Sequence, residues 1–114
     1  MTPPARYPVE GTVRVSPAVI RSVAALTAMQ VPGVVAVGKR RSPPRGKPFP
    51  AGYHDGVRAE VENETAYVDI DLTVDASANL VEVGRRVQRE VASAIETMIG
   101  LRAPVVNVRI QDVV

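Results

Sequence analysis

Two neighbouring segments near the middle of the chain alternate apolar and polar residues with the period of a β-strand. In Val57–Glu62, valines and Ala59 share one face and charged residues share the other, and Tyr67–Asp75 alternates in the same way. Only a short connection with Asn63 and Glu64 separates them, which is typical of an antiparallel hairpin. A sheet with one apolar face has to be covered on that face, so other segments must supply the cover.

Two further segments have the three- and four-residue spacing of helices that bury one side. The first begins at Ser16-Pro17, a favoured N-cap followed by a residue suited to the first turn, and continues to Met29. The second begins at Asn79, with Glu82 placed as in a capping box, and Gly100 is placed to end it. The apolar stripes predicted to face the sheet are Val19, Ile20, Val23, Ala24, Leu26 and Thr27, and then Leu80, Val83, Val87, Val91, Ala94, Ile95 and Met98.

Three shorter segments, Gly11–Val15, Val34–Val37 and Val105–Gln111, are predicted to be strands. The elements then follow the order β-α-β-β-β-α-β. This order predicts an α+β two-layer sandwich, in which a mixed sheet carries both helices on one face. The other face would stay open to water or to a partner. Its predicted residues are Arg58, Glu60, Tyr67, Asp69, Asp71, Thr73, Asn107 and Arg109.

The chain is expected to form one domain over residues 11–114, because 114 residues suffice for one hydrophobic core and not for two. The proline-rich residues 1–10 are predicted to form a flexible N-terminal segment. Residues 38–56 contain four prolines, which exclude a regular element and predict a long basic loop. Loops of this length in compact domains tend to be functional or disordered.

The loop at 38–56 also concentrates positive charge. Between residues 39 and 47 five basic side chains occur with no acid among them: Lys39, Arg40, Arg41, Arg45 and Lys47. The other nine basic residues are outnumbered by 12 acidic ones, which argues against broad nucleic-acid binding by the body of the protein. The loop could attract an acidic partner or anionic lipid head groups, or it could serve only as a solvated segment.

No set of residues predicts an enzyme. The chain has no cysteine, which excludes disulfides, thiolate chemistry and cysteine-ligated metals. Its single histidine, His54, lies beside Asp55 in the proline-rich loop, where a solvated role is expected rather than catalysis. We therefore predict no catalytic residue and no cofactor.

Three aspartates, Asp69, Asp71 and Asp75, share one face of a predicted strand and could hold a hard cation. Alternate polar positions are ordinary on an exposed strand, however, and Arg58 and Arg109 are expected to lie across from these carboxylates. Ion pairing is the favoured interpretation, and no metal site is predicted.

Two phosphate- and nucleic-acid-binding motifs were tested and are not matched. Gly38 and Gly46-Lys47 are too far apart for a nucleotide phosphate loop, and Pro48 stands where Ser or Thr would coordinate magnesium. The element order is KH-like or ferredoxin-like, but the GXXG loop with which KH modules grip RNA is missing. Nucleic acid is therefore not the expected partner.

The start of the sequence lacks the apolar segment of a signal peptide, and no run approaches the roughly 20 apolar residues of a membrane span. A cytoplasmic location is expected from these two features.

Five segments, in their order along the chain, resemble the alkaline-shock or general-stress protein family of mostly Gram-positive bacteria, also called the envelope stress response family. They are GTVRVSPAVI, VPGVVAVG, YVDIDLTVD, VGRRVQREVASAIETMIGL and VVNVRIQDV, and they extend over nearly all of the chain from Gly11 to Val113. The order and spacing of these segments carry the resemblance. The sequence departs from the family in its longer, more cationic loop and in Ser77-Ala78-Asn79, where the family often has a Tyr-Gly pair.

The resemblance implies a non-enzymatic cytoplasmic protein that self-associates. Family members are linked to envelope homeostasis and alkaline stress, and some gather at the inner membrane face through a separate membrane-anchored partner. The expected function is therefore stress and envelope homeostasis through protein–protein interaction. The alternative is a regulatory module that binds an anionic ligand or RNA through the basic loop.

Overall fold

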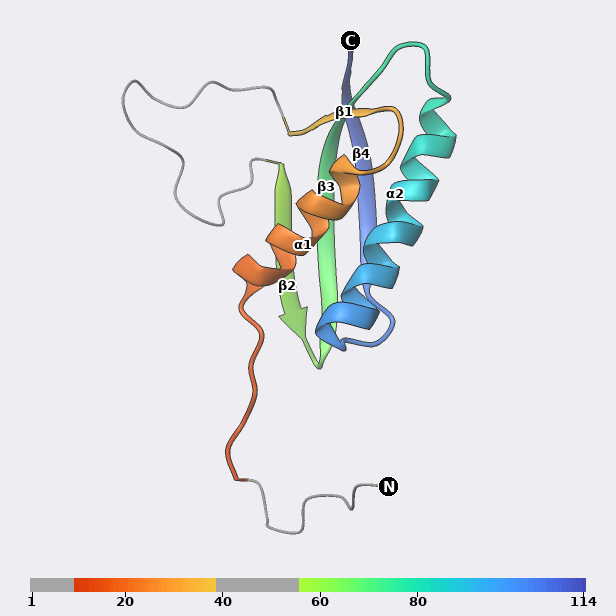
Figure 1. Ribbon diagram of the computed structural model, residues 1–114. Coiled ribbons are helices and arrows are strands. Elements are labelled where there is room, and N and C mark those ends of the chain that lie inside the picture. The colour runs from red at the N-terminus through yellow and green to blue at the C-terminus, as the bar shows by residue number, and fades with distance from the viewer. Residues whose placement is uncertain (1–9, 39–55) are drawn as a thin grey trace, which may run out of the picture.

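The computed structural model describes residues 10–38 and 56–114 (Figure 1). The predicted flexible segment lies outside these ranges except for Glu10. The predicted basic residues Lys39, Arg40, Arg41, Arg45 and Lys47, and also His54, lie outside them as well.

The described residues form an α+β fold, as predicted. Helix α1 is followed by three strands, a second helix that ends in a π-helical turn, and a last strand. The elements are α1 (Pro17–Met29), β1 (Val34–Val37), β2 (Val57–Glu62), β3 (Thr65–Val74), α2 (Leu80–Ala94), η1 (Ile95–Ile99) and β4 (Val105–Val113).

Strand β3 is the centre of a four-stranded mixed sheet. Strand β4 pairs with it in parallel along one edge, from Tyr67↔Val105 onward. Strands β1 and β2 both pair with it antiparallel, β1 with the end of β3 and β2 with its beginning. The tight turn of the β2–β3 hairpin is made by Asn63 and Glu64, both with positive φ. The sheet is therefore mixed, and β3 is enclosed on both edges.

Strands β1 and β2 are two halves of one edge strand. The Gly38 amide, just after β1, donates to the Asp71 carbonyl at 2.6 Å, and the Asp71 amide donates to the Gly56 carbonyl, just before β2, at 2.8 Å. A Cβ built on Gly56 would lie 2.5 Å from the Gly38 Cα, and both glycines have positive φ. Only glycine fits so close a meeting of two backbones. Residues 39–55 thus start and finish at the same point of the sheet edge.

Helix α1 begins as predicted, because the Ser16 side chain accepts a hydrogen bond from the Ala18 amide and Pro17 occupies the first turn. Its buried side differs from the prediction. The buried residues are Ile20, Ala24, Ala25 and Ala28. Val19 and Leu26 were predicted to face the sheet but are exposed, Leu26 by 63%. The helix is apolar on most of its circumference, so spacing alone could not identify the inner side.

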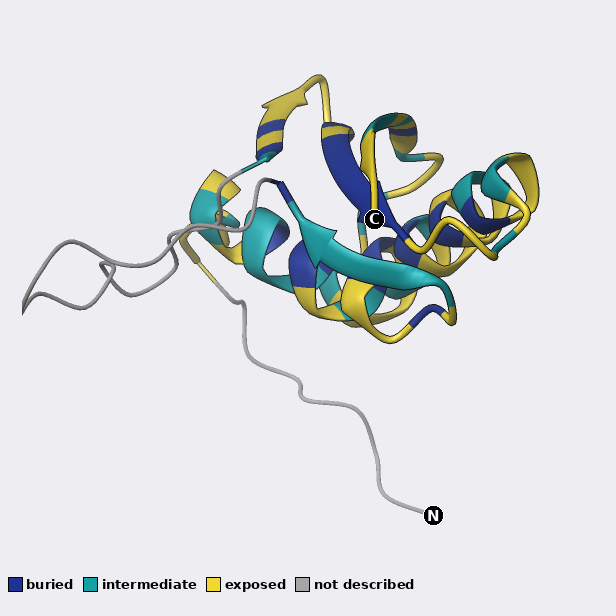
Figure 2. Ribbon diagram, turned by 90° about the horizontal axis from the view of Figure 1, so that it is seen from above, coloured by how far each residue is buried: buried dark blue, intermediate teal, exposed yellow. Residues whose placement is uncertain are grey.

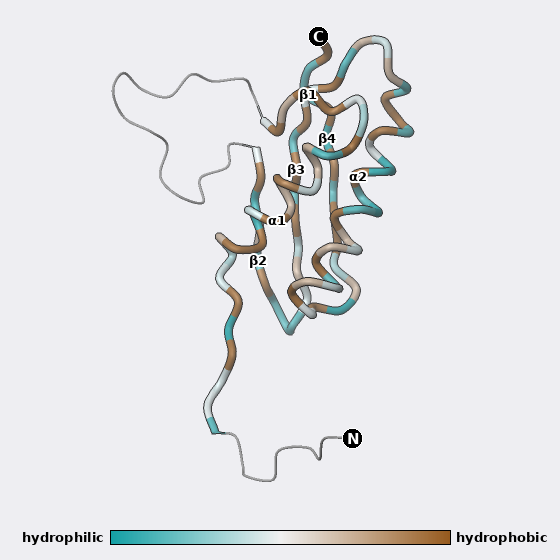
Figure 3. The backbone as a smooth tube through the Cα atoms, in the orientation of Figure 1, coloured by the Kyte–Doolittle hydropathy of each residue, from teal (hydrophilic) through white to brown (hydrophobic). Residues whose placement is uncertain are grey.

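Helix α2 is capped by the Asn79 side chain, which accepts a hydrogen bond from the Glu82 amide at 3.1 Å, as predicted. Its hydropathy changes within each turn (Figure 3), and Val83, Val87 and Val91 are buried. The predicted stripe fails at its end, where Met98 is 71% exposed. The π-helical turn η1 adds one residue to the turn and rotates the positions that follow. Gly100 ends the helix in the left-handed conformation.

The two helices lie on the same face of the sheet, as predicted (Figures 1 and 2). Helix α1 packs against β1, β2 and α2, and α2 packs against β4. The core between the layers consists mainly of branched aliphatic side chains of β3 and α2, and Val68, Ile70, Leu72 and Val74 of β3 are almost completely buried. Each such side chain contributes on the order of 1.5–3 kcal/mol to folding.

The first predicted strand does not form. Residues 11–15 are irregular, and Val13 is 96% exposed. Residues 11–15 pair with none of the four strands of the sheet. Alternation marks a segment that can form a strand, but a strand also needs a neighbour to bond its backbone groups. The order among the described residues is therefore α-β-β-β-α-β.

None of the helices in residues 10–38 and 56–114 is both long and apolar enough to cross a bilayer.

Candidate interaction site on the open sheet face

The sheet face away from the helices carries the polar residues that the alternation predicted. On β2 and β3 these positions alternate with buried core residues. Six of the eight predicted side chains are exposed, whereas Asp71 and Thr73 are buried, Asp71 to 5% exposure. The full set is Arg58, Glu60, Tyr67, Asp69, Asp71, Thr73, Asn107 and Arg109, and we call this surface the open face.

A three-strand ion-pair network lies at the centre of the open face. Arg109 of β4 donates through Nε and Nη2 to the two carboxylate oxygens of Asp71, at 3.1 and 3.0 Å. Arg58 of β2 reaches the same carboxylate from the other side, with both contacts at 3.4 Å. Arg109 is the direct neighbour of Asp71 in the register, whereas Arg58 is the neighbour of Asp69 and reaches diagonally. The longer contacts of Arg58 follow from that diagonal path.

The electrostatics of Asp71 favour its charged form. Burial acts to raise the pKa of Asp71, but the hydrogen bonds from Arg58 and Arg109 outweigh it, so the pKa lies below the ordinary value. The hydrogen bond between Arg58 and Asp71 also raises the pKa of Arg58. Arg58 and Arg109 keep 59% and 71% of their side chains exposed, so each has donors left for another molecule.

The three aspartates that were considered as a metal site do not converge. Asp71 binds the two arginines, Asp69 accepts a hydrogen bond from the Asn107 side chain at 3.0 Å, and the Asp75 carboxylate accepts from the Ser77 hydroxyl at 2.7 Å and its amide at 2.8 Å. Those bonds from Ser77 lower the pKa of Asp75. Among the described residues, no three His, Cys, Asp or Glu side chains come together as a metal site.

The two buried members of the open face also fix the meeting point of β1 and β2. The Thr73 hydroxyl donates to the Gly38 carbonyl at 3.0 Å. The backbone of Asp71 binds Gly38 and Gly56, while its side chain binds both arginines. Asp71 therefore connects the start and finish of the 39–55 segment with the charged centre of the face.

An apolar pair lies on the open face two rows from Asp71 and Arg109. Tyr67 and Val105 are neighbours in the β3–β4 register, and both are about two-fifths exposed. Glu60 is the neighbour of Tyr67 on β2. A shallow open hollow of about 210 Å³ lies at the charged centre of the face, and it is lined by Arg58, Asp69, Ile70, Asp71, Asn107, Val108 and Arg109. An aromatic and an arginine pair on an open surface are features of contact sites between proteins.

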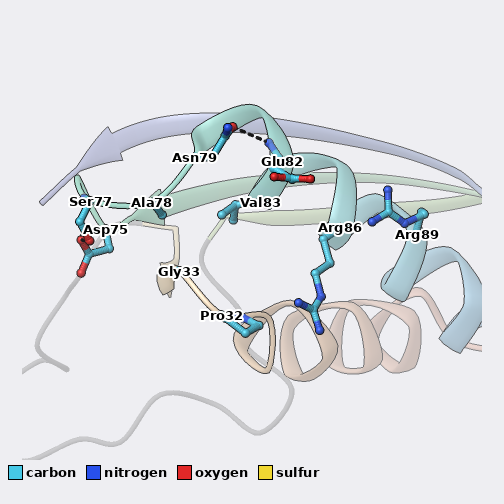
Figure 4. Close-up of a pocket in the computed structure, with 10 residues that line it drawn as sticks. All are labelled: Pro32, Gly33, Asp75, Ser77, Ala78, Asn79, Glu82, Val83, Arg86 and Arg89. Carbon is cyan, nitrogen blue, oxygen red and sulfur yellow. Dashed lines mark hydrogen bonds between the residues drawn. The ribbon is translucent and has the colours of Figure 1, made fainter.

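A second hollow, of about 600 Å³, lies on the helix side at the start of α2 (Figure 4). Its lining includes the acids Asp75 and Glu82 and the bases Arg86 and Arg89. The Asn79 side chain already caps the Glu82 amide there. Arg86 also forms an ion pair with Glu90 at 4.0 Å, and both side chains are exposed. Mixed charges and an occupied helix cap give this hollow no preference for an anion or a cation.

Sequence reasoning placed the residues of the open face correctly but did not single out Asp71. In the alternating pattern, Asp69 and Asp71 are equivalent. Their difference comes from the register, which brings Arg109 beside Asp71 and Asn107 beside Asp69. The hollow at the start of α2 was not predicted either, because it depends on how Pro32 and Gly33 approach α2.

Comparison with known proteins gives one family and one group of structures. The model of the alkaline shock protein family, described as having a cell envelope-related function, matches residues 7–114. No curated protein sequence matches the chain. The MamM CTD in its copper form is similar in structure, with a TM-score of 0.58 and 18% identity over 82% of each chain.

Two MamM CTD variants, one of them in a zinc form, each have a TM-score of 0.51 and 18% identity. They match 82% of this chain and 89% and 82% of their own. At such identity the likeness concerns the fold, and it agrees with the predicted ferredoxin-like α+β arrangement.

Proposed function

The chain belongs to the alkaline shock protein family, which has a cell envelope-related function, and from this we propose that it is a non-enzymatic protein that self-associates and supports envelope homeostasis under stress. It acts through contacts with other proteins. We further propose that it works in the cytoplasm, near the inner face of the membrane, and that a membrane-anchored partner protein brings it there.

The observation that carries this proposal is the open face. It is a broad surface formed by β2, β3 and β4, with an aromatic residue, a valine and two arginines whose donors are only partly used. A flat surface with anchors of this kind suits recognition of another protein. The hollow on it is shallow and open, which suits docking better than enclosure of a small substrate.

Sedimentation velocity over a wide range of protein concentrations tests self-association. We expect the sedimentation coefficient to rise with concentration, and the rise to weaken in Tyr67→Ser, which removes the aromatic anchor of the open face. Val81→Ser is the matched control, because Val81 is an exposed apolar residue on α2. A wild-type protein that stays monomeric at the highest concentrations contradicts the proposal.

A second candidate function is binding of an anionic ligand or RNA through Lys39, Arg40, Arg41, Arg45 and Lys47. It is favoured by the meeting of Gly38 and Gly56 at Asp71, which puts both chain ends of this basic segment beside the open face. Replacing the five basic residues by Ser and measuring binding to RNA and to anionic vesicles at two salt concentrations separates the two functions. Loss of a steeply salt-dependent RNA affinity supports the second candidate, and unchanged binding contradicts it.

A further inference from the structure

We propose that the open faces of two copies of this chain pack on each other across a two-fold axis, so that Arg58 of each copy meets Glu60 of the other. This inference rests on the self-association proposed above and specifies the surface and the partner. It is carried by the charge pattern of the open face.

Strand β2 presents one positive and one negative side chain next to each other on this face. Arg58 and Glu60 are both exposed, and they alternate with the buried Val57 and Ala59. Two residues along a strand correspond to roughly 7 Å. A two-fold axis that lies between the sheets, perpendicular to the strands and midway between these residues, places Arg58 over Glu60 of the second copy. Because the operation is symmetric, it forms this pair twice.

The same axis also sets which residues of β3 and β4 face each other between the two copies, because the register aligns the three strands in rows. One row contains Glu60, Tyr67 and Val105, and the next contains Arg58, Asp69 and Asn107. The axis between the rows places Tyr67 over Asp69 of the second copy, where the phenol hydroxyl can donate to the carboxylate. It also places the apolar Tyr67 and Val105 near the centre of the contact, where anchors contribute most.

Charge complementarity favours a second copy over a partner of a single charge sign. A uniformly acidic surface would be repelled by Glu60 and Asp69, and a uniformly basic surface would be repelled by Arg58 and Arg109. The open face itself carries both signs in adjacent rows, so a copy turned by the two-fold axis matches both of them. Packed sheets lie about 10 Å apart, a distance that Arg and Glu side chains can span together.

Arg58 can make this contact without leaving Asp71 unpaired. Its own contacts with Asp71 are 3.4 Å long, whereas Arg109 binds the same carboxylate at 3.0 and 3.1 Å. A guanidinium has five N–H donors, so Arg58 can bind Asp71 and a second carboxylate together. Within residues 10–38 and 56–114, Glu60 forms no ion pair.

The test is a charge exchange followed by sedimentation equilibrium. In a dimer of Arg58→Glu, both inter-copy ion pairs become pairs of acids, and in a dimer of Glu60→Arg they become pairs of bases. Each variant alone should therefore self-associate at least about tenfold more weakly than wild type. A one-to-one mixture of the two variants recreates both opposite-charge pairs, and its association should return to within about threefold of wild type. Recovery on mixing cannot come from a general folding defect.

The matched controls are Arg85→Glu and Glu96→Arg, which make the same charge changes at exposed positions of α2 and η1. They should leave association unchanged, alone and mixed. If Glu60→Arg associates as strongly as wild type, or if folded variants fail to recover on mixing, the inferred face is wrong while self-association stands. A wild type that stays monomeric contradicts the proposed function itself.

Arg58→Glu also loses the contact with Asp71, so its folding is checked by thermal unfolding. If it does not fold, labelled Glu60→Arg titrated with wild type provides the test. That mixed dimer keeps one of its two opposite-charge pairs. It must therefore bind more tightly than Glu60→Arg binds itself, and equal affinities overturn the inference.

Discussion

Asp71 is a single residue that connects strands β2, β3 and β4. Its carboxylate binds Arg58 of β2 and Arg109 of β4, and its backbone binds Gly38 and Gly56. Hydrogen bonds between charged groups contribute more than neutral ones, typically about 1.5–3 kcal/mol. The exposure of both guanidinium groups to solvent places the contribution here toward the lower end.

Asp71→Asn should lower the free energy of unfolding by about 1–2 kcal/mol near pH 7. The pKa of Asp71 is lower in the folded protein, so its stabilisation is complete above the ordinary Asp pKa of about 4 and is lost as the pH falls through the folded value. The difference between wild type and Asp71→Asn should therefore shrink as the pH is lowered below about 4. Urea unfolding at a series of pH values measures it.

Asp69→Asn is the control for this pH dependence, because Asp69 is exposed and its carboxylate accepts a hydrogen bond from the neutral Asn107 side chain rather than from an arginine. We expect it to change stability little at any of these pH values. A constant gap between wild type and Asp71→Asn down to the lowest pH would show that the Asp71 carboxylate is not held ionised by its two arginines.

The single-residue features of the open face show what alternation can and cannot predict. Period-two spacing placed Asp69 and Asp71 on the face opposite the helices, and this is confirmed. Spacing carries no information on which strand residue lies beside which, and the difference between an exposed Asp69 and a buried Asp71 depends on that register. The central ion pair was therefore predicted only as a general neighbourhood of arginines and aspartates.

Helix α1 has an outer side almost as apolar as its inner side. Arg21 is its one charged residue, and Val19, Leu26 and Met29 are exposed. The start of the helix could be predicted because Ser16-Pro17 marks it. The inner side could not, since a helix that is apolar all round has no distinct stripe to orient it. Small alanines fill the inner side and let the helix approach the sheet closely.

Substitution on the two sides of α1 should therefore have unequal effects. Ile20 is completely buried, so Ile20→Ala should cost about 2–5 kcal/mol of stability through the cavity that it leaves. Leu26→Ala should change stability by no more than about 0.5 kcal/mol, as expected for surface positions. Thermal and urea unfolding of the two variants give the comparison. Equal losses would mean that the two sides of α1 are buried alike.

Two other differences between the predicted and the observed elements also arise because the sequence of one segment does not show which other segments will lie next to it. Residues 11–15 alternate like a strand, but they pair with none of the four strands of the sheet. Met98 fits the apolar stripe of an ideal α-helix, but the extra residue of η1 turns it outward. Both errors arise where local pattern and tertiary context differ.

At the scale of the whole molecule, the layer architecture could be predicted because β2, β3 and α2 each have one polar and one apolar side, and α1 is apolar enough to need a partner surface. Two helices on one face of a mixed sheet follow from that requirement, and the structure confirms them. The joining of β1 and β2 into one edge strand could not be predicted. In the sequence, the two strands are separated by residues 39–55 and look like independent elements.

Removal of residues 39–55 should leave the fold intact. Because Gly38 and Gly56 meet at Asp71, a link of one or two glycines between them should restore a continuous edge strand. We expect an unchanged circular dichroism spectrum and a melting temperature within a few degrees of wild type. Shorter loops cost less closure entropy, which favours the shortened chain slightly. An unfolded product would mean that the segment contributes to the core.

The meeting of two glycines at one carbonyl and one amide makes this point of the sheet edge a tolerant insertion site. Chain length should be able to change there without moving a core residue, so the position should accept appendages of different size. Protein engineers could use the same site to install a tag, a sensor or a binding peptide next to Asp71 and its two arginines.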